Sequence, residues 1–457
     1  MLSVQVRSKK KSLTKLRGGV PPLFIMYHLN PFVHIFERND VVALYNALTL
    51  NTLYLKRPEF EKLSFSDPSK ELVDNEFVVG PDFNAVDYFT DHKPNEQSSE
   101  LSVAYFLLTS GCNLRCKYCF VETRMNNPKT TVMTEETAEA ALKMLQRNIP
   151  KDATVVFYGG EPFLNFPVMQ YIVRRCEEMD LNAHFVVVTN GLLITSETAS
   201  FLEAKKFDVG ISLDGDMEVN DAMRVDHENQ GSFDRIEKAI TVLIEHGIVP
   251  SISCTLSKHN WERPDNIISL IKKYRLPGFG YNLPAINGNI RFSKEERAVL
   301  IKHLIAAETE IVKNRLVEDK VVDRRLKSFV EQRIWLKDCA AYGQQFVVTP
   351  NGKVGVCHGL WPDETNGESK TYYNLDVSYD KLLNEHQDWQ EWFSRTPYNM
   401  PECWSCPSIA LCGGGCAKNS LLTKSSIWSK DEDICQLMEQ LLPWTIWTYY
   451  DIREGVY

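Results

Sequence analysis

The sequence lacks long apolar runs, internal repeats and an excess of basic residues, and each absence excludes a class of protein. Its apolar runs, such as 22–27 and 441–444, are far too short to cross a bilayer. Residues 1–17 carry six Lys or Arg, but no apolar segment of a secretory signal follows them. A net charge of −9 argues against a chain that binds nucleic acid. We therefore expect neither a membrane nor nucleic acid as a partner.

Cysteine is too scarce for a disulfide-stabilised secreted scaffold, at 12 of 457 residues, but it is strongly clustered. Three cysteines lie within Cys112–Cys119 and seven between Cys339 and Cys435. Clustered cysteines without a secretory signal indicate a reducing cytoplasm and metal or redox chemistry. Cys176 and Cys254 stand alone in apolar surroundings, so we expect both to be buried core thiols.

From Leu101 onward the sequence alternates apolar runs with helical segments. Strands are predicted at 103–108, 154–158, 184–189, 207–213, 250–256 and 279–283. Helices are predicted at 134–148, 167–179, 196–205, 233–246 and 263–274. This order predicts parallel strands joined by right-handed crossovers, with ligand sites at their carboxyl ends. Two further helices are expected within 293–336, and short strands at 345–349 and 353–357.

A cysteine motif follows the first predicted strand directly. Cys112, Cys116 and Cys119 have the spacing CxxxCxxC. Three thiolates can hold three irons of a [4Fe–4S] cubane and leave the fourth iron open for chemistry. Zinc is an alternative, but it needs a fourth ligand, and His92, the nearest upstream histidine, precedes the first strand. Three buried structural thiols are a further alternative.

This motif, with Tyr118 before its last cysteine and within a six-strand series, resembles that of the radical S-adenosylmethionine (SAM) enzymes. The resemblance implies an α/β fold, a partial (β/α)6 barrel, in which Cys112, Cys116 and Cys119 hold the cluster that binds SAM. The second strand ends in Gly159-Gly160-Glu161-Pro162, a motif that contacts the methionyl amino group of SAM in the family. Glycines permit close backbone approach, and a carboxylate suits an ammonium group.

The resemblance implies contacts with SAM at nine positions: Tyr118, Gly159, Gly160, Glu161, Asn190, Ser212, Asp214, Arg224 and Leu256. Several have a plainer alternative. The glycine pair suits an ordinary turn, Asn190 suits a turn and Asp214 a helix cap. Arg224 is equally consistent with a solvated surface charge.

The second cysteine group has the spacing Cys-x12-Gly-x4-Cys, then Cys-x2-Cys-x5-Cys-x3-Cys-x18-Cys. Part of it would suit a zinc ribbon, but the complete pattern resembles the SPASM extension of radical SAM enzymes. That resemblance implies two auxiliary [4Fe–4S] clusters, three clusters in all. The first would be held by Cys339, Cys357 and Cys416, and the second by Cys403, Cys406, Cys412 and Cys435. The eighth cysteine of some relatives is absent, so the first auxiliary cluster would have an open iron or take His358 or Asp338.

The first hundred residues predict strands at 33–37 and 41–45, a strand or short helix at 50–55, a helix start at 58–63 and a strand at 76–79. In peptide-modifying relatives a small winged-helix-like domain at this place adds the leader of a precursor peptide to a sheet edge. A cap on the barrel is the alternative. The basic arm 7–17 is either a mobile tail or an electrostatic guide for an acidic leader.

The resemblances together predict a radical SAM maturase of ribosomally made peptides. Its partners would be a precursor peptide and a one-electron donor such as a flavodoxin or ferredoxin. It would form a 5′-deoxyadenosyl radical, abstract a hydrogen and close a thioether or carbon–carbon bond. No general base is identified. The alternatives are a formylglycine-generating sulfatase maturase or small-molecule dehydrogenase, and a non-catalytic iron–sulfur or zinc protein.

These predictions divide the chain into six segments. They are a leader-peptide-recognition-like domain (1–90), a linker (91–100), the radical SAM domain (101–290), a helical bridge (291–337), the SPASM domain (338–442) and a C-terminal tail (443–457).

Overall fold

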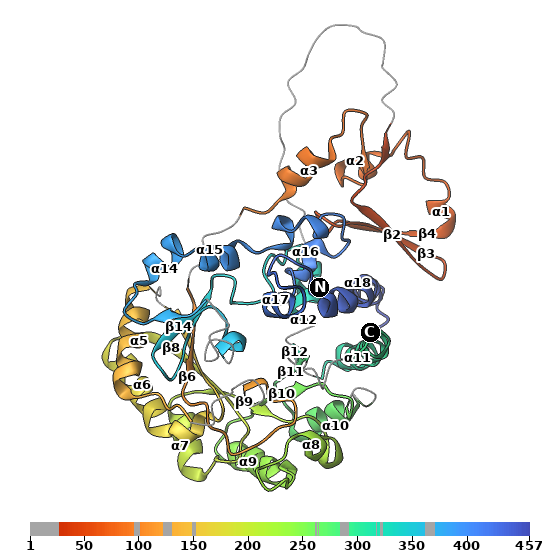
Figure 1. The fold of residues 1–457 in the computed structure, drawn as a ribbon. Coiled ribbons are helices and arrows are strands. Elements are labelled where there is room, and N and C mark those ends of the chain that lie inside the picture. Colours follow the sequence, from red (N-terminus) through yellow and green to blue (C-terminus); the bar gives the residue numbers. More distant parts are fainter. Residues whose placement is uncertain are drawn as a thin grey trace.

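The computed structural model describes residues 27–95, 101–121, 130–148, 152–260, 263, 265–283, 292–316, 318–319, 323–361 and 371–457. The basic arm at 7–17 and part of the predicted linker lie outside these residues. Figure 1 shows a large sheet ringed by helices, a C-terminal region beside it and a smaller N-terminal region that projects from the C-terminal one.

Six parallel strands form the main part of the largest sheet. They are β6 (Val103–Leu107), β7 (Asp152–Tyr158), β8 (Asn182–Thr189), β9 (Asp208–Ser212), β10 (Ser251–Thr255) and β11 (Gly278–Asn282). Each strand pairs in parallel with the next in the chain, which confirms the predicted alternation. The short β12 (Glu318–Asp319) pairs in parallel with β11.

Helices cover the outer face of these strands, as the crossover connections require (Figure 1). The predicted helices are present as α5 (Glu135–Asn148), α6 (Phe166–Glu178), α7 (Ser196–Ala204), α9 (Phe233–Glu245) and α10 (Asp265–Tyr274). Two elements were not predicted, the turn η1 (Pro162–Asn165) and the helix α8 (Met217–Met223). Asp216 caps α8 by accepting a hydrogen bond from the backbone N–H of Val219.

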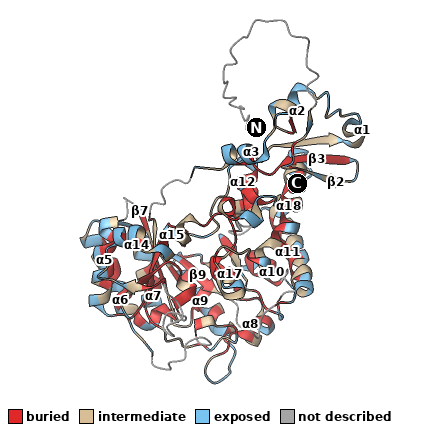
Figure 2. Cartoon of the chain, turned by 45° about the horizontal axis from the view of Figure 1, so that its top comes forward, coloured by how far each residue is buried: buried red, intermediate tan, exposed pale blue. Residues whose placement is uncertain are grey.

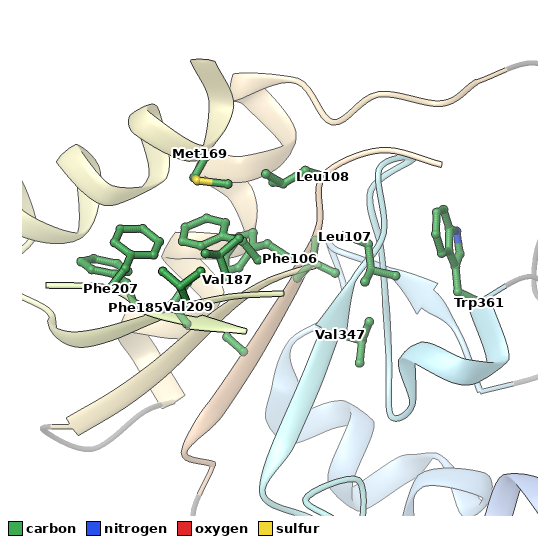
Figure 3. Packing of buried hydrophobic residues seen from close by; sticks show 14 of the residues in the cluster. Phe106, Leu107, Leu108, Met169, Phe185, Val187, Phe207, Val209, Val347 and Trp361 are labelled. Carbon is green, nitrogen blue, oxygen red and sulfur yellow. The ribbon is translucent and has the colours of Figure 1, made fainter. Parts of the chain in front are cut away.

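The core lies between the strands and these helices. Phe157, Phe185 and Phe207 stack with ring centroids 5.3–6.3 Å apart, and Met169 of α6 lies over the sheet (Figure 3). The strands are buried while the outer faces of α5 and α6 are exposed (Figure 2). Cys176 and Cys254 are fully buried, which confirms that both are core thiols.

The C-terminal region extends the same sheet instead of forming a separate one. β13 (Gln345–Val348) pairs in parallel with β6, so that Val347 lies beside Tyr105. β14 (Lys353–Gly355) and β15 (Tyr373–Asn374) continue the sheet in antiparallel pairings. β13 and β14 were predicted as strands, whereas β15 and the addition of these strands to β6 were not. This pairing brings Cys357, just after β14, close to the six parallel strands.

The rest of the C-terminal region is helical. The predicted pair within 293–336 is present as α11 (Lys294–Asn314) and α12 (Asp323–Val330). The later elements are η2 (His358–Leu360), α14 (Tyr379–Glu385), α15 (Gln387–Ser394), η3 (Pro397–Asn399), η4 (Pro401–Cys403), α16 (Ile409–Cys412), α17 (Ala417–Lys424) and α18 (Glu432–Arg453).

The prediction of a separate C-terminal tail at 443–457 was wrong, because α18 runs continuously through Pro443. Proline costs a helix one backbone hydrogen bond, and here tertiary packing tolerates that loss. Most of the predicted tail is the second half of α18, and its Ile446 is fully buried. The proposed boundary at 442/443 therefore cuts one element in two.

The N-terminal region contains a three-stranded antiparallel sheet, ordered β2 (Val33–Arg38), β3 (Val41–Asn46) and β4 (Thr52–Lys56). The segment at 50–55 is therefore a strand. The remaining elements are α1 (Arg57–Phe60), α2 (Lys70–Asp74), α3 (Ala85–His92) and the pair β1 (His28–Leu29) and β5 (Val78–Val79). The linker predicted from residue 91 begins inside α3, a helix capped by Asn84.

The N-terminal sheet is anchored to α18. The guanidinium of Arg38 donates two hydrogen bonds to Asp451, one of them 2.8 Å long. The hydroxyl of Tyr54 donates to the carbonyl of Ile446 at 2.7 Å. Arg38 also lies 4.7 Å from the centroid of the Trp447 ring. In the part of the chain that the structure describes, no helix is both long and apolar enough to cross a membrane.

Candidate functional site

The CxxxCxxC loop lies at the carboxyl end of β6, where parallel sheets place ligand sites. On one side it is held by the segment after α8. The N–H of Arg115 donates to the carbonyl of Val225 at 2.7 Å, and that of Lys117 to Met223 at 3.0 Å. These contacts could not be predicted from the sequence, because backbone pairing uses no particular side chain.

The three cysteines of this loop are half-buried free thiols. Burial is the main cause that raises the pKa of Cys112 to about 12, and the Glu161 carboxylate and the other two thiols raise it further. Thiolates so close together need a cationic partner, and cluster iron supplies one while displacing the protons. The donor set therefore fits a [4Fe–4S] cluster on Cys112, Cys116 and Cys119.

Zinc receives no support from the arrangement of side chains. Among the described residues, no three His, Cys, Asp or Glu side chains are grouped so that they could hold one metal ion. All twelve cysteines lie within those residues, and none forms a disulfide.

Gly159 and Gly160 are required where the end of β7 meets the cysteine loop. The N–H of Gly160 donates to the carbonyl of Thr109 at 2.7 Å, and that of Glu161 to Gly111 at 2.8 Å. Gly159 has a φ of +137°, and a methyl group on either glycine would overlap a carbonyl oxygen of the loop. The glycines thus serve more than an ordinary turn. Their contact with SAM stays a prediction.

Glu161 braces the ends of β7 and β8. Its carboxylate is 1% exposed and accepts hydrogen bonds from the Thr189 hydroxyl at 2.6 Å, the Asn190 N–H at 2.9 Å and the Phe163 N–H at 3.2 Å. Burial raises the pKa of Glu161 to about 7 despite these hydrogen bonds. Glu161 therefore connects the end of β7 to the end of β8 through hydrogen bonds. The sequence did not indicate this structural role.

Asn190 connects β8 to the cysteine loop. Its side-chain amide donates to the side-chain oxygen Oδ1 of Asn113 at 2.7 Å and lies 3.6 Å from the sulfur of Cys112. Its own side-chain oxygen accepts the N–H of Leu192, as in a turn. Asn190 therefore shapes a turn and also touches a predicted cluster ligand.

Tyr118, Asp214 and Arg224 form a buried polar group against the cysteine loop. The Tyr118 hydroxyl donates to Asp214 at 2.6 Å, and Arg224 donates to the same carboxylate at 3.0 Å. The guanidinium lies 5.3 Å from the centroid of the Tyr118 ring. Asp214 also accepts the N–H of Thr255 at 2.9 Å. The surface-charge alternative for Arg224 and the helix-cap alternative for Asp214 are both wrong.

The other predicted contact residues lie at neighbouring strand ends. Ser212 is the half-buried last residue of β9, and Leu256 follows β10 and is buried. His227 was not predicted, yet its Nε2 lies 3.0 Å from the carbonyl oxygen of Cys112. The carboxyl ends of β6 to β10 therefore surround one loop, and together they could hold a polar cofactor beside a cluster.

The second cysteine array folds into two groups of thiols. Burial and then the Cys416 thiol raise the pKa of Cys357 to about 11. Burial also raises the pKa of Cys416 to about 12, and the Cys339 thiol adds to that rise. These three cysteines, which are separated by up to 77 positions in the sequence, are therefore neighbours.

Cys403, Cys406, Cys412 and Cys435 form the other group. Burial and then the thiols of Cys403 and Cys406 raise the pKa of Cys435 to about 12. Burial raises the pKa of Cys412 to about 12, and Cys435 contributes to it. The structure thus brings together the two ligand sets that the resemblance implied.

The two candidates for an additional ligand have other neighbours. Asp338 accepts hydrogen bonds from Arg324 at 2.9 Å and Arg325 at 2.7 Å. The His358 ring lies 4.9 Å from the Tyr105 ring and 5.2 Å from the Tyr158 ring, so it is directed towards β6 and β7. Neither contact set indicates a ligand to the first auxiliary cluster.

Comparison with known proteins agrees with this geometry. Residues 106–271 match the family model described as the Radical SAM superfamily. These residues form a radical SAM domain. The family implies a [4Fe–4S] cluster and SAM, and the chain is accordingly an enzyme.

Two curated relatives extend the similarity beyond the radical SAM domain. The radical SAM cyclopropyl synthase TigE of Paramaledivibacter caminithermalis is 21% identical, with 88% of each chain covered. The cysteine-type anaerobic sulfatase-maturating enzyme of Clostridium novyi is 27% identical over 68% of this chain and 86% of its own.

Two solved structures share the fold around the radical SAM domain. Native anSMEcpe with bound AdoMet gives a TM-score of 0.66 at 22% identity, covering 77% of this chain and 99% of its own. Streptococcus suis SuiB bound to the precursor peptide SuiA gives 0.55 at 16% identity, covering 90% of this chain and all of its own.

Proposed function

We propose that this protein is a radical SAM maturase that modifies a residue of a ribosomally made precursor peptide and closes a thioether or carbon–carbon cross-link. The observation that carries the proposal is the N-terminal three-stranded sheet, which is anchored to α18 beside the second cysteine array. Its outer strands, β2 and β4, each pair on one side only within the described residues. A peptide strand could add to either edge.

The extent of the comparisons supports a peptide substrate. Among the curated relatives, TigE covers 88% of this chain and the Clostridium novyi sulfatase-maturating enzyme covers 68%. Among the solved structures, SuiB covers 90% and anSMEcpe covers 77%, although anSMEcpe has the higher TM-score. SuiB was solved with a precursor peptide bound. In each comparison the longer match is therefore to TigE or SuiB.

The residues of the chain suit radical chemistry in an enclosed site. A [4Fe–4S] cluster with bound SAM supplies, on one-electron reduction, a 5′-deoxyadenosyl radical that abstracts hydrogen. Cys112, Cys116 and Cys119 would hold that cluster. Asn190 and the Asp214–Arg224 pair fix the loop that carries them, so the donor and the target hydrogen can be held in contact.

The two C-terminal thiol groups would hold two auxiliary clusters. Cys339, Cys357 and Cys416 lie at the sheet extension made by β13 and β14, beside the radical SAM domain. Cys403, Cys406, Cys412 and Cys435 lie towards the N-terminal sheet. The two auxiliary clusters would carry the surplus electron away from the substrate. They would also receive electrons from a flavodoxin or ferredoxin.

A sulfatase maturase that makes formylglycine is the second candidate. Its support is the 27% identity with the Clostridium novyi enzyme, over 86% of that enzyme. It offers no role for the N-terminal sheet.

The deciding experiment is anaerobic co-expression of this chain with short candidate precursor peptides, followed by mass spectrometry. Cross-linking predicts a loss of two hydrogens per event, located by fragmentation between two residues. A cysteine-containing sulfatase peptide is the parallel substrate, and deletion of residues 1–95 is the matched variant. Precursor modification that this deletion abolishes would support the proposal.

Three results would overturn it. Conversion of the sulfatase peptide alone, unaffected by the deletion, would establish the second candidate. Altered stereochemistry of the precursor without a change in mass would exclude bond formation. Purified protein that contains zinc in place of about twelve irons, the content of three cubanes, would exclude radical SAM chemistry.

A further inference from the structure

Tyr45 of the N-terminal sheet places a polar group where the packing is otherwise apolar. The residue lies in the central strand β3 and is fully buried, between the rings of Phe36 at 6.2 Å and Phe329 at 6.0 Å. Its hydroxyl is buried and has no hydrogen-bond partner among the described residues. A buried hydroxyl without a hydrogen-bond partner destabilises the fold, so its presence here calls for an explanation.

Tyr398 presents a second hydroxyl of the same kind. It lies in η3, five residues before Cys403, and is 1% exposed. The Trp404 indole donates to its carbonyl at 3.1 Å, and the Phe89 ring of α3 lies 5.7 Å away. Its hydroxyl is also buried without a hydrogen-bond partner in the described chain.

These hydroxyls converge on the four-cysteine group. Tyr45 and Tyr398 belong to one apolar cluster that also contains Ile409–Leu411 and packs against Cys412. Burial, then Tyr398 and then Cys406, raises the pKa of Tyr45, so both groups lie near Tyr45. The two buried hydroxyls therefore belong to the apolar cluster that borders the four-cysteine group, where a sulfur-rich acceptor is expected.

We propose that Tyr45 and Tyr398 donate hydrogen bonds to sulfur atoms of a cluster held by Cys403, Cys406, Cys412 and Cys435. This inference rests on the auxiliary cluster included in the proposed function. It makes the N-terminal sheet part of that cluster's immediate surroundings. A domain expected to bind peptide thereby touches a redox centre through one side chain.

The expected consequence is a higher reduction potential. Hydrogen bonds to cluster sulfur stabilise the more negative, reduced form, and they are among the factors that set such potentials. Replacing either tyrosine with phenylalanine removes the donor and leaves the ring in the core. Each change should lower the equilibrium constant for reduction about tenfold, which corresponds to ~59 mV for one electron.

The test is a redox titration of the full-length, iron-loaded protein, followed by electron paramagnetic resonance. Y45F and Y398F are compared with the unmodified protein and with Y379F. Tyr379 is a matched control, because its hydroxyl is also buried and without a hydrogen-bond partner in the described residues, and it belongs to a different apolar cluster from Tyr45 and Tyr398. A second readout is the exchangeable-proton coupling to the cluster in H2O and D2O.

The inference is supported if Y45F and Y398F each lower one midpoint potential and remove one exchangeable-proton coupling, while Y379F does neither. It is overturned if the midpoints and couplings of both variants equal those of the unmodified protein at full iron content. If the unmodified protein loads only the cluster of the radical SAM domain, the auxiliary cluster fails and the inference with it. Peptide modification is measured separately, so a failure of the proposed substrate is distinguishable.

Discussion

The surroundings of the first cysteine loop are polar and charged, whereas those of the four-cysteine group combine aromatic rings with the buried Arg325–Asp338 pair. Asp214, Arg224 and Asn190 are buried against the first loop and connected by hydrogen bonds. Around the second group the Phe89 ring lies 5.2 Å from Trp404 and 5.7 Å from Tyr398. Polar groups suit a site that must bind a charged cofactor, and aromatic rings suit one that must exclude water.

The two regions also differ in how the chain assembles them. The first three thiols lie within eight consecutive positions, so one loop contains them, and distant strand ends fix its conformation. The four-cysteine group spans Cys403 to Cys435 and is covered by α3 and β3 from the other end of the chain. The first cysteine loop thus needs tertiary contacts only to hold its conformation. The four-cysteine group needs them to bring its thiols together.

The largest expected effect separates the two regions by function. Cys116→Ala should abolish 5′-deoxyadenosine formation, because it removes a ligand of the cluster that binds SAM. Cys406→Ala should lower the iron content by about four, one cubane, and leave SAM cleavage detectable. Chromatography of the SAM products and iron analysis measure both. Equal loss of cleavage in the two variants would contradict the separation.

Asp214→Asn should destabilise the protein by about 3–5 kcal/mol, because it leaves the buried Arg224 without its charge partner. Asp208→Asn, at the exposed start of β9, the strand that ends just before Asp214, is the matched control and should change stability by less than about 0.5 kcal/mol. Urea denaturation of the iron-free chain measures both. If Asp214→Asn changed stability as little as Asp208→Asn, the Asp214–Arg224 ion pair would not stabilise the first cysteine loop.

Gly160→Ala should cost about 1–3 kcal/mol, because the added methyl group overlaps the carbonyl of Gly111 and forces the two loops apart. Gly280→Ala is the control, since a methyl group in β11 meets no atom within 4 Å. The Gly160 variant should also weaken SAM binding, measured by calorimetry. Unchanged stability and affinity would argue against a tight loop contact.

The smallest effect is a pH dependence of the N-terminal region. His92 and Glu76 are 2.8 Å apart, and their hydrogen bond raises the pKa of His92 and lowers that of Glu76. The stabilisation that comes from protonated His92 is lost as pH rises through the raised His92 pKa. The stabilisation that comes from ionised Glu76 is lost as pH falls through the lowered Glu76 pKa. Stabilisation is therefore fullest between the ordinary values of 4.5 and 6.5.

Glu76 is 41% exposed, so this pair should contribute at most about 1 kcal/mol. Urea midpoints at pH 6 and pH 9 should show a small loss of stability at the higher pH. His92→Gln should remove that difference. An identical pH dependence in the variant would assign it to other groups.

Much of the fold could be predicted because its signals are local. The apolar runs of β6 to β11 and the helices between them were identified within a few residues of their observed bounds. The helix α8 was missed, and α18 was divided at Pro443. A short helix has little periodicity, and a proline reads as a boundary unless the packing that tolerates it is known.

The candidate site divides in the same way. Cysteine spacing predicted the first loop and the two groups of thiols that the structure brings together; their role as cluster ligands stays a prediction. The partners of Glu161, the burial of Arg224 and the place of Tyr45 in the apolar cluster beside Cys412 could not be predicted from the sequence. Which residue a buried charge meets depends on strands that lie far apart in the chain.

The sequence by itself determined the α/β alternation, the places of the cysteines and the glycines that allow close backbone approach. Only the tertiary structure decided that β13 extends the sheet beside β6, that α18 anchors the N-terminal sheet, and that β3 reaches the four-cysteine group. The physical reason is range. Periodicity and spacing act over a few residues, whereas pairing between distant segments is selected by the burial of the whole core.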